Sequence, residues 1–513
     1  MSKENPPCIT LVIRGARLLD PVSPEAKPPA RDIFISGTRI ESVTPPAERP
    51  APAGAEVIEA AGQLAIPGLV SAHYHSHDTL LKGSFAPMPL EAWFLHALPP
   101  NYPKRSKEEL RARVLIGALE CLKAGITTVQ DMATVYPFDP ADVDTILKAY
   151  DDIGIRCVFA MQVGDAPGSR GVPFWDEVIP AELRKSTTSS VRSGGKAREL
   201  IDIVAGEISR NRGKHSRITW GIGPATPENC SEEFLQNVAE LSERERLPVF
   251  SHVYESKATA VIARRAYGSD GGSLIRHLER MGLLGPRFTI AHGVWLTRDD
   301  IERVAAAGAH VALNPLCNLK AKSGVAPIRA YIEAGVKVGL GTDNSSCSDS
   351  QNLFQAMKMF VLLSAAGSPE RDGPVSLDAF RAATLGSAQA IGLAGEVGSV
   401  APGMKADITL INLRDPSFVP LNDAVRQLVC TEPGRSVRHV IVDGRVVIRD
   451  GRAMTLDEDA LYEEIADLMP VLEKDLAVIR ARNETLMPYV EEAHRRTLAV
   501  DVGLDRFVAG DPA

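Results

Sequence analysis

Three histidines alternate along one short segment of the chain, His73-Tyr74-His75-Ser76-His77. The apolar run before them, residues 66–72, predicts a β-strand, on which residues two apart point to the same face. His73 and His75 would then face one point, and a pair of imidazoles suits a Zn, Fe, Ni or Cu ion. Two neighbouring strand histidines also arise by chance, so the pattern alone does not establish a metal site. His77 could be a third ligand, but because it lies past the expected strand end we expect it to contact the ligand residues or to line the pocket rather than to bind the ion.

Three later apolar runs also lead to residues that can bind a metal or move a proton. They end in His252, His292 and Asp343, and Glu255 follows His252 by three positions. Taken singly, a histidine that ends a buried strand is more often a core residue, and an aspartate after glycine is common in turns. What favours a shared site is that all four apolar runs, including the one before His73, end in a residue that can bind a metal.

The elements around these residues predict a parallel barrel. Between residues 66 and 395, short apolar runs alternate with amphipathic helical windows, which is typical of an α/β domain. This span of about 330 residues exceeds the ~250 of a plain (β/α)8 barrel but fits one with insertions. The C-terminal ends of barrel strands meet on one face, so the four runs would bring their histidines and aspartate together there. Three histidines and one aspartate leave room for a water on the ion, which marks a catalytic rather than a structural site.

Strand patterns at both ends of the chain flank the α/β region. Residues 1–65 alternate apolar and polar positions around glycine turns, and the pattern returns over residues 396–455. We therefore expect an α/β fold, with a (β/α)8 TIM-type barrel over residues 66–395 and a small β-sandwich domain built from both chain ends. Residues 456–513 are predicted to form a helical extension. The segment 165–195, rich in Gly, Ser, Thr and Pro, is predicted to be an insertion or a lid.

Composition narrows the classes of partner and compartment. The 513 residues carry a formal net charge of −8 and show no basic stripe, which argues against a nucleic-acid or membrane partner. No stretch approaches the ~18 apolar residues that span a bilayer, and the N-terminus does not look like a signal peptide. The seven cysteines are widely spaced and odd in number, which favours a reducing, cytoplasmic location over a disulfide framework.

In combination these motifs resemble those of the amidohydrolase superfamily, in its branch of cytosine, guanine, adenosine-homologue and triazine hydrolases. The resemblance covers nearly the whole chain. The motifs that carry it are Pro67-Gly68-Leu69-Val70 before His-x-His, Leu80-Leu81-Lys82-Gly83, His252-x-x-Glu255, Ala291-His292, Asn314-Pro315-Leu316-Cys317-Asn318, Gly339-Leu340-Gly341-Thr342-Asp343 and Gly398-Ser399-Val400-Ala401-Pro402-Gly403.

The resemblance implies a ligand set and two further catalytic roles. The implied ligands of one divalent ion, with Zn favoured over Fe, are His73, His75, His252 and Asp343. Glu255 would carry protons to the substrate, and His292 would hydrogen-bond a metal-bound hydroxide or a developing oxyanion. The chemistry agrees, because a metal lowers the pKa of bound water to about 7, Asp343 can accept the proton released, and a positioned acid such as Glu255 can protonate a ring nitrogen.

Two features depart from the family pattern. Many two-metal relatives have a bridging lysine after a mid-barrel strand, but residues 218–225 contain none, which favours a single ion. Nucleoside deaminases of this branch often have Pro-His there, and this chain has Pro224-Ala225, which puts nucleoside substrates in doubt. Trp93 and Asn318 lie in loops that often line the pocket, although packing explains Trp93 equally well.

The first hypothesis is an aminohydrolase that removes ammonia or an alkylamine from a nitrogen heteroaromatic ring by attack of a metal-bound hydroxide. The alternative is hydrolysis of an amide, urea or carbamate, or displacement of halide, at the same mononuclear site. A third hypothesis, a catalytically dead scaffold, is disfavoured because all four ligand positions are retained. The expected partner is a small nitrogen-containing substrate, and the family resemblance implies a homodimer or a higher homo-oligomer.

Overall fold

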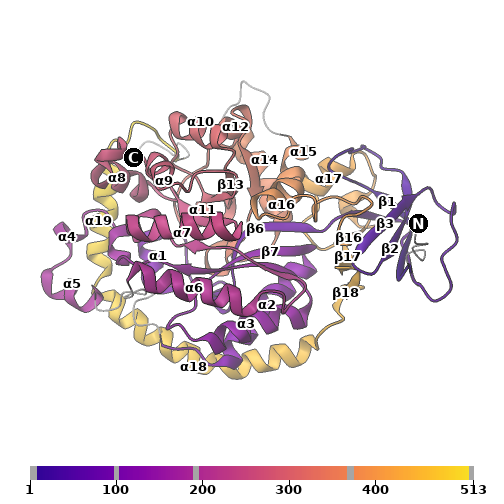
Figure 1. Cartoon of the computed structure of the whole chain (residues 1–513), viewed down its shortest axis with the longest axis horizontal. Coiled ribbons are helices and arrows are strands. Elements are labelled where there is room, and N and C mark those ends of the chain that lie inside the picture. The colour runs from indigo at the N-terminus through magenta and orange to yellow at the C-terminus, as the bar shows by residue number, and fades with distance from the viewer. Residues whose placement is uncertain (1–7, 98–102, 189–195, 367–374, 508–513) are drawn as a thin grey trace.

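The computed structural model describes residues 8–97, 103–188, 196–366 and 375–507. Their centre is a barrel of parallel strands surrounded by helices, and a sheet of strands from both chain ends lies at one end of the molecule (Figure 1). The predicted α/β fold with a TIM-type barrel is confirmed. The division of the chain at residues 65, 395 and 455 stays a prediction.

Ten parallel strand segments form the barrel wall in the described part of the chain. One hydrogen-bonded sheet runs in the order β15-β6-β7-β8 with β9 and β10, and the other runs β11-β12-β13-β14. A parallel bridge from Ile222 to Val249 joins the sheets on one side, and β14 continues into β15 on the other. The strands are β6 Leu69–His75, β7 Ile126–Ala133, β8 Arg156–Val163, β9 Ile218–Trp220, β10 Gly223–Pro224, β11 Val249–Val253, β12 Phe288–His292, β13 His310–Leu313, β14 Lys337–Leu340 and β15 Asp343–Asn344.

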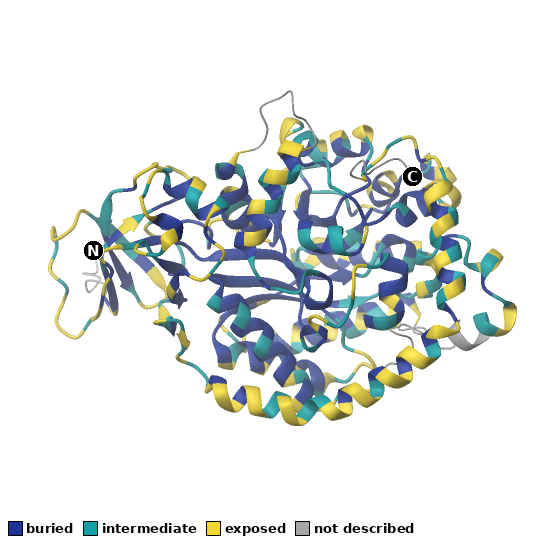
Figure 2. Cartoon of the chain, turned by 180° about the vertical axis from the view of Figure 1, so that it is seen from behind, coloured by how far each residue is buried: buried dark blue, intermediate teal, exposed yellow. Residues whose placement is uncertain are grey.

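Burial on both faces explains why the barrel strands have nearly continuous apolar sequences. Every residue of β6 and β7 is buried, because barrel strands face side chains on the inside and helices on the outside (Figure 2). The helices around the barrel begin with side-chain caps: Ser106, Asp139 and Ser231 accept bonds from backbone N–H groups of α2, α3 and α7.

The helices between residues 90 and 390 are as follows: α1 Leu90–Ala97, α2 Lys107–Lys123, α3 Pro140–Ile153, α4 Trp175–Val178, α5 Ala181–Thr188, α6 Ala197–Asn211, α7 Glu232–Glu245, α8 Lys257–Ala266, α9 Leu274–Arg280, α10 Arg298–Ala307, α11 Pro315–Lys320, α12 Ile328–Glu333, α13 Ser345–Ser348, α14 Leu353–Ala366, α15 Ser376–Arg381 and α16 Ser387–Ala390. Short 3-10 turns lie at η1 Thr79–Leu81, η2 Gly168–Gly171, η3 Pro227–Asn229 and η4 Gly268–Asp270, and a π-helical turn, η5, spans Ala382–Gly386. The segment predicted as an insertion or lid holds η2, α4 and α5, and its residues 189–195 lie outside the described part.

Strands from the two chain ends share one nine-stranded sheet. Its order is β19-β18-β17-β16-β5-β1-β2-β3, with β4 also paired to β1. The central pairing of β5 with β16 is antiparallel and joins residues almost 350 positions apart, from Ile408 opposite Pro67 to Asn412 opposite Gln63. The strands are β1 Leu11–Leu18, β2 Ala30–Ser36, β3 Arg39–Thr44, β4 Glu56–Glu59, β5 Gln63–Pro67, β16 Ile408–Asn412, β17 Val437–Val442, β18 Arg445–Arg449 and β19 Arg452–Ala453.

A buried ion network joins this sheet to the barrel. Arg156, at the start of β8, donates from Nε and Nη2 to the two carboxylate oxygens of Asp407 at 2.9 and 3.0 Å. Its Nη2 also lies 3.0 Å from Asp443 Oδ1, and Lys405 Nζ lies 3.2 Å from the same oxygen. Two cations therefore balance two carboxylates at the end of the barrel opposite the strand C-termini.

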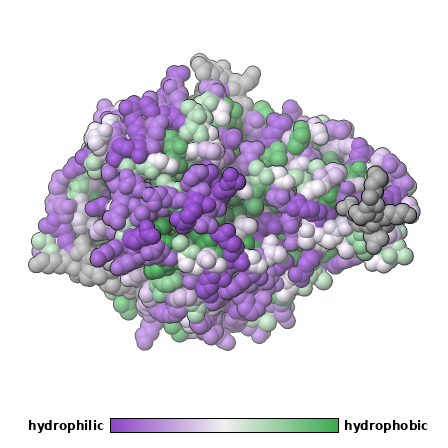
Figure 3. All heavy atoms as spheres, in the orientation of Figure 1, coloured by the Kyte–Doolittle hydropathy of each residue, from purple (hydrophilic) through white to green (hydrophobic). Residues whose placement is uncertain are grey.

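The C-terminal helices wrap around the barrel. α17 (Ala424–Cys430) packs against α14 and α15, and α18 (Glu458–Glu484) and α19 (Met487–Ala499) run along the outside of the barrel to its far end (Figure 1). α19 contacts α1, α4 and α8, so it reaches the side on which the barrel strands end. The face seen in the orientation of Figure 1 is mostly hydrophilic, with hydrophobic residues showing near its centre (Figure 3). Among the described residues, no helix has the length and apolar character needed to cross a bilayer.

Candidate metal centre and cavity

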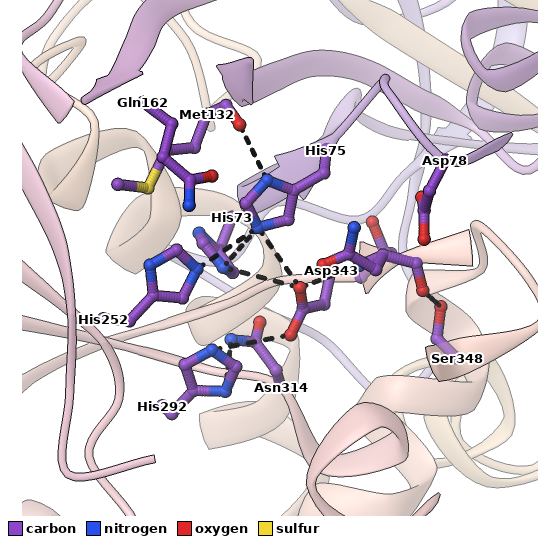
Figure 4. A network of polar contacts seen from close by, with 12 residues as sticks. His73, His75, Asp78, Met132, Gln162, His252, His292, Asn314, Asp343 and Ser348 are labelled. Atoms are coloured by element: carbon purple, nitrogen blue, oxygen red, sulfur yellow. Dashed lines mark hydrogen bonds and ion pairs between the residues drawn. The ribbon is translucent and has the colours of Figure 1, made fainter. Parts of the chain in front are cut away.

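Four imidazoles and one carboxylate meet at the C-terminal ends of the barrel strands (Figure 4). β6 supplies two of the histidines, β11 and β12 supply one each, and β15 supplies the aspartate. Two overlapping groups have ligand atoms close enough to hold one ion, and the residues of these groups are His73, His75, His252, His292 and Asp343. The structure thus brings together all the positions that the sequence placed at strand ends.

Four distances between the facing atoms match those of a tetrahedral metal site. His75 Nε2 lies 3.2 Å from His73 Nε2 and 3.3 Å from His252 Nε2. Asp343 Oδ1 lies 3.5 Å from His73 Nε2 and 3.4 Å from His75 Nε2. Ligand atoms about 2.0–2.1 Å from a tetrahedral zinc ion are roughly 3.3–3.4 Å from one another. The four residues therefore fit a divalent ion.

The outer nitrogens of two histidines fix their tautomers. His75 Nδ1 donates to the carbonyl oxygen of Met132 at 2.7 Å, and His252 Nδ1 donates to that of Ala225 at 2.8 Å. Each neutral ring then presents a lone pair at Nε2, and these two lone pairs face each other across 3.3 Å. Burial lowers the pKa of His75 to about 3 and that of His252 to about 4, so neither ring is protonated at neutral pH. A cation is the partner that such facing lone pairs require.

Asp343 sits in a strained turn at the end of the barrel wall. Its φ is +60°, in the left-handed region, and a Cβ on Gly341 would lie 2.8 Å from the Cβ and carbonyl oxygen of His73. The Gly-Thr-Asp sequence therefore lets the backbone pass close to β6 and aims the carboxylate at the histidines. Burial raises the pKa of Asp343 to about 7, and its Oδ2 has no hydrogen-bond partner among the described residues.

Glu255 and His292 lie beside this cluster. His292 Nε2 is 3.5 Å from Glu255 Oε2 and 3.6 Å from Asp343 Oδ2. Burial, followed by the charges of Asp343, Glu228 and Glu91, raises the pKa of Glu255 well above its usual range. These surroundings favour the protonated form of the Glu255 carboxyl, which can act as an acid. Three titratable groups of different basicity thus surround one small space.

Asn318 lies behind His292 and is not among the residues that line the cavity. Its Oδ1 faces His292 Nδ1 at 2.8 Å, closer than the 3.3 Å from Asn314 Nδ2 to the same nitrogen. The shorter contact favours a hydrogen on Nδ1, which leaves a lone pair on Nε2. His292 would then donate from Nε2 only as an imidazolium.

The other two predicted pocket residues have different positions. Trp93 is 4% exposed, lines the cavity and donates from Nε1 to Ser346 Oγ at 2.8 Å. His77 stacks edge-on against His75 with ring centres 5.2 Å apart, and its Nε2 lies 3.4 Å from Asn344 Nδ2. His77 is not among the described lining residues of the cavity.

A cavity of about 420 Å³ opens above the cluster. This volume lies within the roughly 300–1,000 Å³ of small-molecule sites. Its floor is formed by His75, His252, Glu255, His292 and Asp343. The walls come from α1, the segment after β8, η3 and α19, and they include Trp175 and Val490. The predicted insertion and the C-terminal helices thus both contribute to the wall.

Sequence reasoning missed two carboxyl groups in this wall. Glu91, on α1, is 4% exposed and its Oε2 lies 3.5 Å from His494 Nδ1 of α19. Glu228, on η3, is 6% exposed. Glu228 follows the C-terminal end of a barrel strand by four positions, so the rule that selected the histidines could have found it. No comparable local signal links Glu91 to a helix 400 residues later.

The chain is similar to known proteins over most of its length. The model of the amidohydrolase family matches residues 64–447. A 5′-deoxyadenosine deaminase of Methanothermobacter thermautotrophicus is 32% identical over 410 residues, which are 79% of this chain and 87% of the relative. A 5-methylthioadenosine/S-adenosylhomocysteine deaminase of Pelotomaculum thermopropionicum is 30% identical over 458 residues, 88% of this chain and 96% of the relative.

Solved structures share the fold. An adenosine deaminase from Xanthomonas campestris with bound zinc superposes with a TM-score of 0.78 at 23% identity, covering 96% of this chain and 100% of that one. An atrazine chlorohydrolase from Arthrobacter aurescens in complex with zinc superposes with a TM-score of 0.77 at 23% identity, covering 90% and 100%. The same barrel therefore supports more than one reaction in these neighbours.

Proposed function

Since this chain belongs to the amidohydrolase family, we propose that it is a hydrolytic deaminase that acts on an amino-substituted, nitrogen-containing aromatic ring. It would use one divalent ion, with Zn favoured over Fe. Family membership makes it a hydrolase of C–N bonds. The relatives at 30–32% identity are deaminases of adenine-containing compounds, which favours ring deamination over amide, urea or carbamate hydrolysis and over halide displacement.

One observation carries the proposal. Two histidine lone pairs fixed by backbone carbonyls face each other beside a buried carboxylate, on the floor of a cavity of small-molecule size. His73, His75, His252 and Asp343 would hold the ion. A divalent ion there would supply Lewis acidity, which makes water ionise near neutral pH.

The remaining chemistry falls to the carboxyl groups. Asp343 Oδ2 has no hydrogen-bond partner among the described residues, and with a pKa of about 7 the Asp343 carboxylate can accept a proton from the attacking water. The protonated Glu255 can deliver a proton to the ring nitrogen beside the attacked carbon, which makes that carbon more electrophilic. His292 lies between both carboxyls and would stabilise negative charge once its Nε2 is protonated.

The direct test is release of ammonia by the purified, zinc-reconstituted protein. The panel would hold 5′-deoxyadenosine, methylthioadenosine, adenine, guanine, cytosine and melamine, with hydantoin and atrazine for the alternative reactions. We expect ammonia from at least one ring amine, and a loss of about 10²–10⁴-fold in Glu255→Gln. Glu233→Gln, which removes an exposed carboxylate from α7, is the matched control.

Three outcomes would contradict the proposal in different ways. Carboxylate release from hydantoin without ammonia from any ring amine would favour amide hydrolysis, and chloride release from atrazine alone would favour halide displacement. A metal content near zero after zinc-supplemented expression, with no turnover, would favour a scaffold.

The environment of the enzyme forms part of the proposal. We place it in the cytoplasm as a homodimer or a higher homo-oligomer, acting on a small molecule without nucleic-acid or membrane partners. The buried thiols of Cys121, Cys157, Cys230, Cys317 and Cys347 are all free, as a reducing compartment requires. Sedimentation analysis of the purified protein would test the assembly.

A further inference from the structure

The cavity is strongly acidic beyond what its floor requires. Besides Asp343 and Glu255, its lining includes Glu91, Glu199 and Glu228, and no lysine or arginine is among the described residues that line it. Neutral histidines on the floor add no positive charge until an ion binds. An anionic substituent on a substrate would therefore find no lysine or arginine to pair with among the described residues of the wall.

Of the three wall carboxyls, Glu228 has the least help from water or from a neighbouring basic group. Its side chain is 6% exposed, and its Oε2 has no hydrogen-bond partner among the described residues. Glu199 lies exposed on α6, where water screens it, and Glu91 has His494 beside it. A buried carboxyl oxygen with no partner in a ligand cavity is a place where the ligand can supply the missing hydrogen bond, so the position of Glu228 Oε2 indicates a partner from outside.

The position of Glu228 relates it directly to the reacting floor. It lies three residues beyond Ala225, whose carbonyl oxygen orients His252. Its charge also contributes to the raised pKa of Glu255, so the two carboxyls lie within electrostatic range of each other. Both residues line the same cavity, so one small molecule can reach Glu228 and Glu255 together.

The aromatic wall favours the same kind of group. Tyr136, Phe138 and Trp175 line the cavity. Aromatic faces attract organic cations, and a carboxylate accepts paired hydrogen bonds from an ammonium, amidinium or guanidinium. Neither feature helps to bind a carboxylate or phosphate.

We propose that Glu228 is a specificity-determining residue that binds a basic nitrogen substituent of the substrate. The substrate class is then an aminated heteroaromatic ring that carries a protonated amine, amidine or guanidine. This inference rests on the proposed deaminase function and narrows it, because carboxylate- and phosphate-bearing compounds are excluded.

Three probes of matched size test the charge preference: 9-(2-aminoethyl)adenine, 9-propyladenine and 9-(2-carboxyethyl)adenine. Binding to the zinc-loaded Glu255→Gln protein would be measured by calorimetry, and ammonia release by the zinc-loaded wild type would be measured in parallel. We expect the aminoethyl compound to bind at least tenfold more tightly than the propyl compound, and the carboxyethyl compound to bind most weakly.

The variant Glu228→Gln separates recognition from a general effect on Glu255. We expect it to lose about 10- to 100-fold in kcat/KM for the aminoethyl compound and little for the propyl compound. A change by the same factor for both compounds would mean that Glu228 acts only through Glu255, and would overturn the proposal. Glu233→Gln should leave all ratios unchanged.

The two readouts distinguish failure of this inference from failure of the proposed function. A charge preference in binding that depends on Glu228, without ammonia release, would sustain the inference and contradict the deaminase. Ammonia release with no charge preference would contradict the inference and sustain the deaminase. Absence of both binding and turnover for all three probes would contradict both.

Discussion

The two ends of the barrel each bury a cluster of charged or titratable side chains, and the clusters are built differently. At the amino end of β8, Arg156 forms paired hydrogen bonds with Asp407 and a contact with Asp443, which Lys405 also approaches. At the carboxyl ends of the strands, neutral imidazoles and carboxyls face one another, and the described residues that line the cavity there include no lysine or arginine.

The difference indicates which cluster serves stability and which serves chemistry. Buried charges that are balanced and hydrogen-bonded need nothing further, so the Arg156 cluster can lock the terminal sheet onto the barrel. The cluster at the strand ends leaves His292 Nε2 and Asp343 Oδ2 without hydrogen bonds, and such groups persist where an ion or a substrate completes them. Changes at the two ends should therefore separate folding from activity.

The largest expected effect is on activity, at the strand ends. His252→Ala removes an implied ligand and should lower ammonia release by roughly 10³-fold or more, while the zinc content per chain falls towards zero. The thermal midpoint of the metal-free protein should change little, because the lost imidazole faces a cavity. Activity assays, elemental analysis and thermal unfolding would be run on the same preparation, and retained zinc with full activity would contradict the ligand assignment.

The next effect is on stability, at the opposite end. Arg156→Met leaves Asp407 and Asp443 buried with only Lys405 nearby, and should cost about 3–5 kcal/mol in the free energy of unfolding. Zinc content and activity per folded molecule should stay at wild-type levels. Arg276→Met is the matched control, because its ion pair with Asp299 is about half exposed and should contribute no more than about 1 kcal/mol.

A smaller effect has a pH signature. Burial raises the pKa of Glu228 to about 7, above its usual value near 4.5. The folded state therefore holds a proton that the unfolded state has lost, so wild-type stability should fall as pH rises from about 4.5 to about 7. Glu228→Gln lacks this dependence, and its stability relative to wild type should rise by about 3 kcal/mol between pH 4.5 and pH 8. Denaturant unfolding at both pH values would measure the change. If the free energy of unfolding of Glu228→Gln differed from that of wild type by the same amount at both pH values, the pKa of Glu228 would not be raised.

Much of the site could be predicted because its signal is local. Each ligand candidate follows an apolar run that ends at a strand terminus, and parallel topology then brings the termini together. The sequence also indicated a turn at Asp343, because an aspartate after glycine is common in turns, and the structure adds that a side chain at Gly341 would collide with β6. The same local logic placed β-strands at both chain ends.

The remaining features depend on contacts that no pattern encodes. Backbone carbonyls of Met132 and Ala225 orient two histidines, and any residue type would supply them. The contact of Glu91 with His494 joins α1 to a helix at the other end of the chain. Asn318 was expected to line the pocket, and only its side-chain direction reveals that it holds His292.

The smallest expected effect tests that last contact. Asn318→Ala removes the acceptor for His292 Nδ1–H, and the ring can then take either tautomer or turn away from Glu255. A single hydrogen bond is worth about 0.5–1.5 kcal/mol, so kcat should fall about 2- to 10-fold with zinc content and KM nearly unchanged. Asn318→Asp should instead favour the doubly protonated ring and displace the pH profile of kcat upward. A change confined to KM would mean that Asn318 contacts the substrate directly. That result would contradict its assignment as the residue that holds His292.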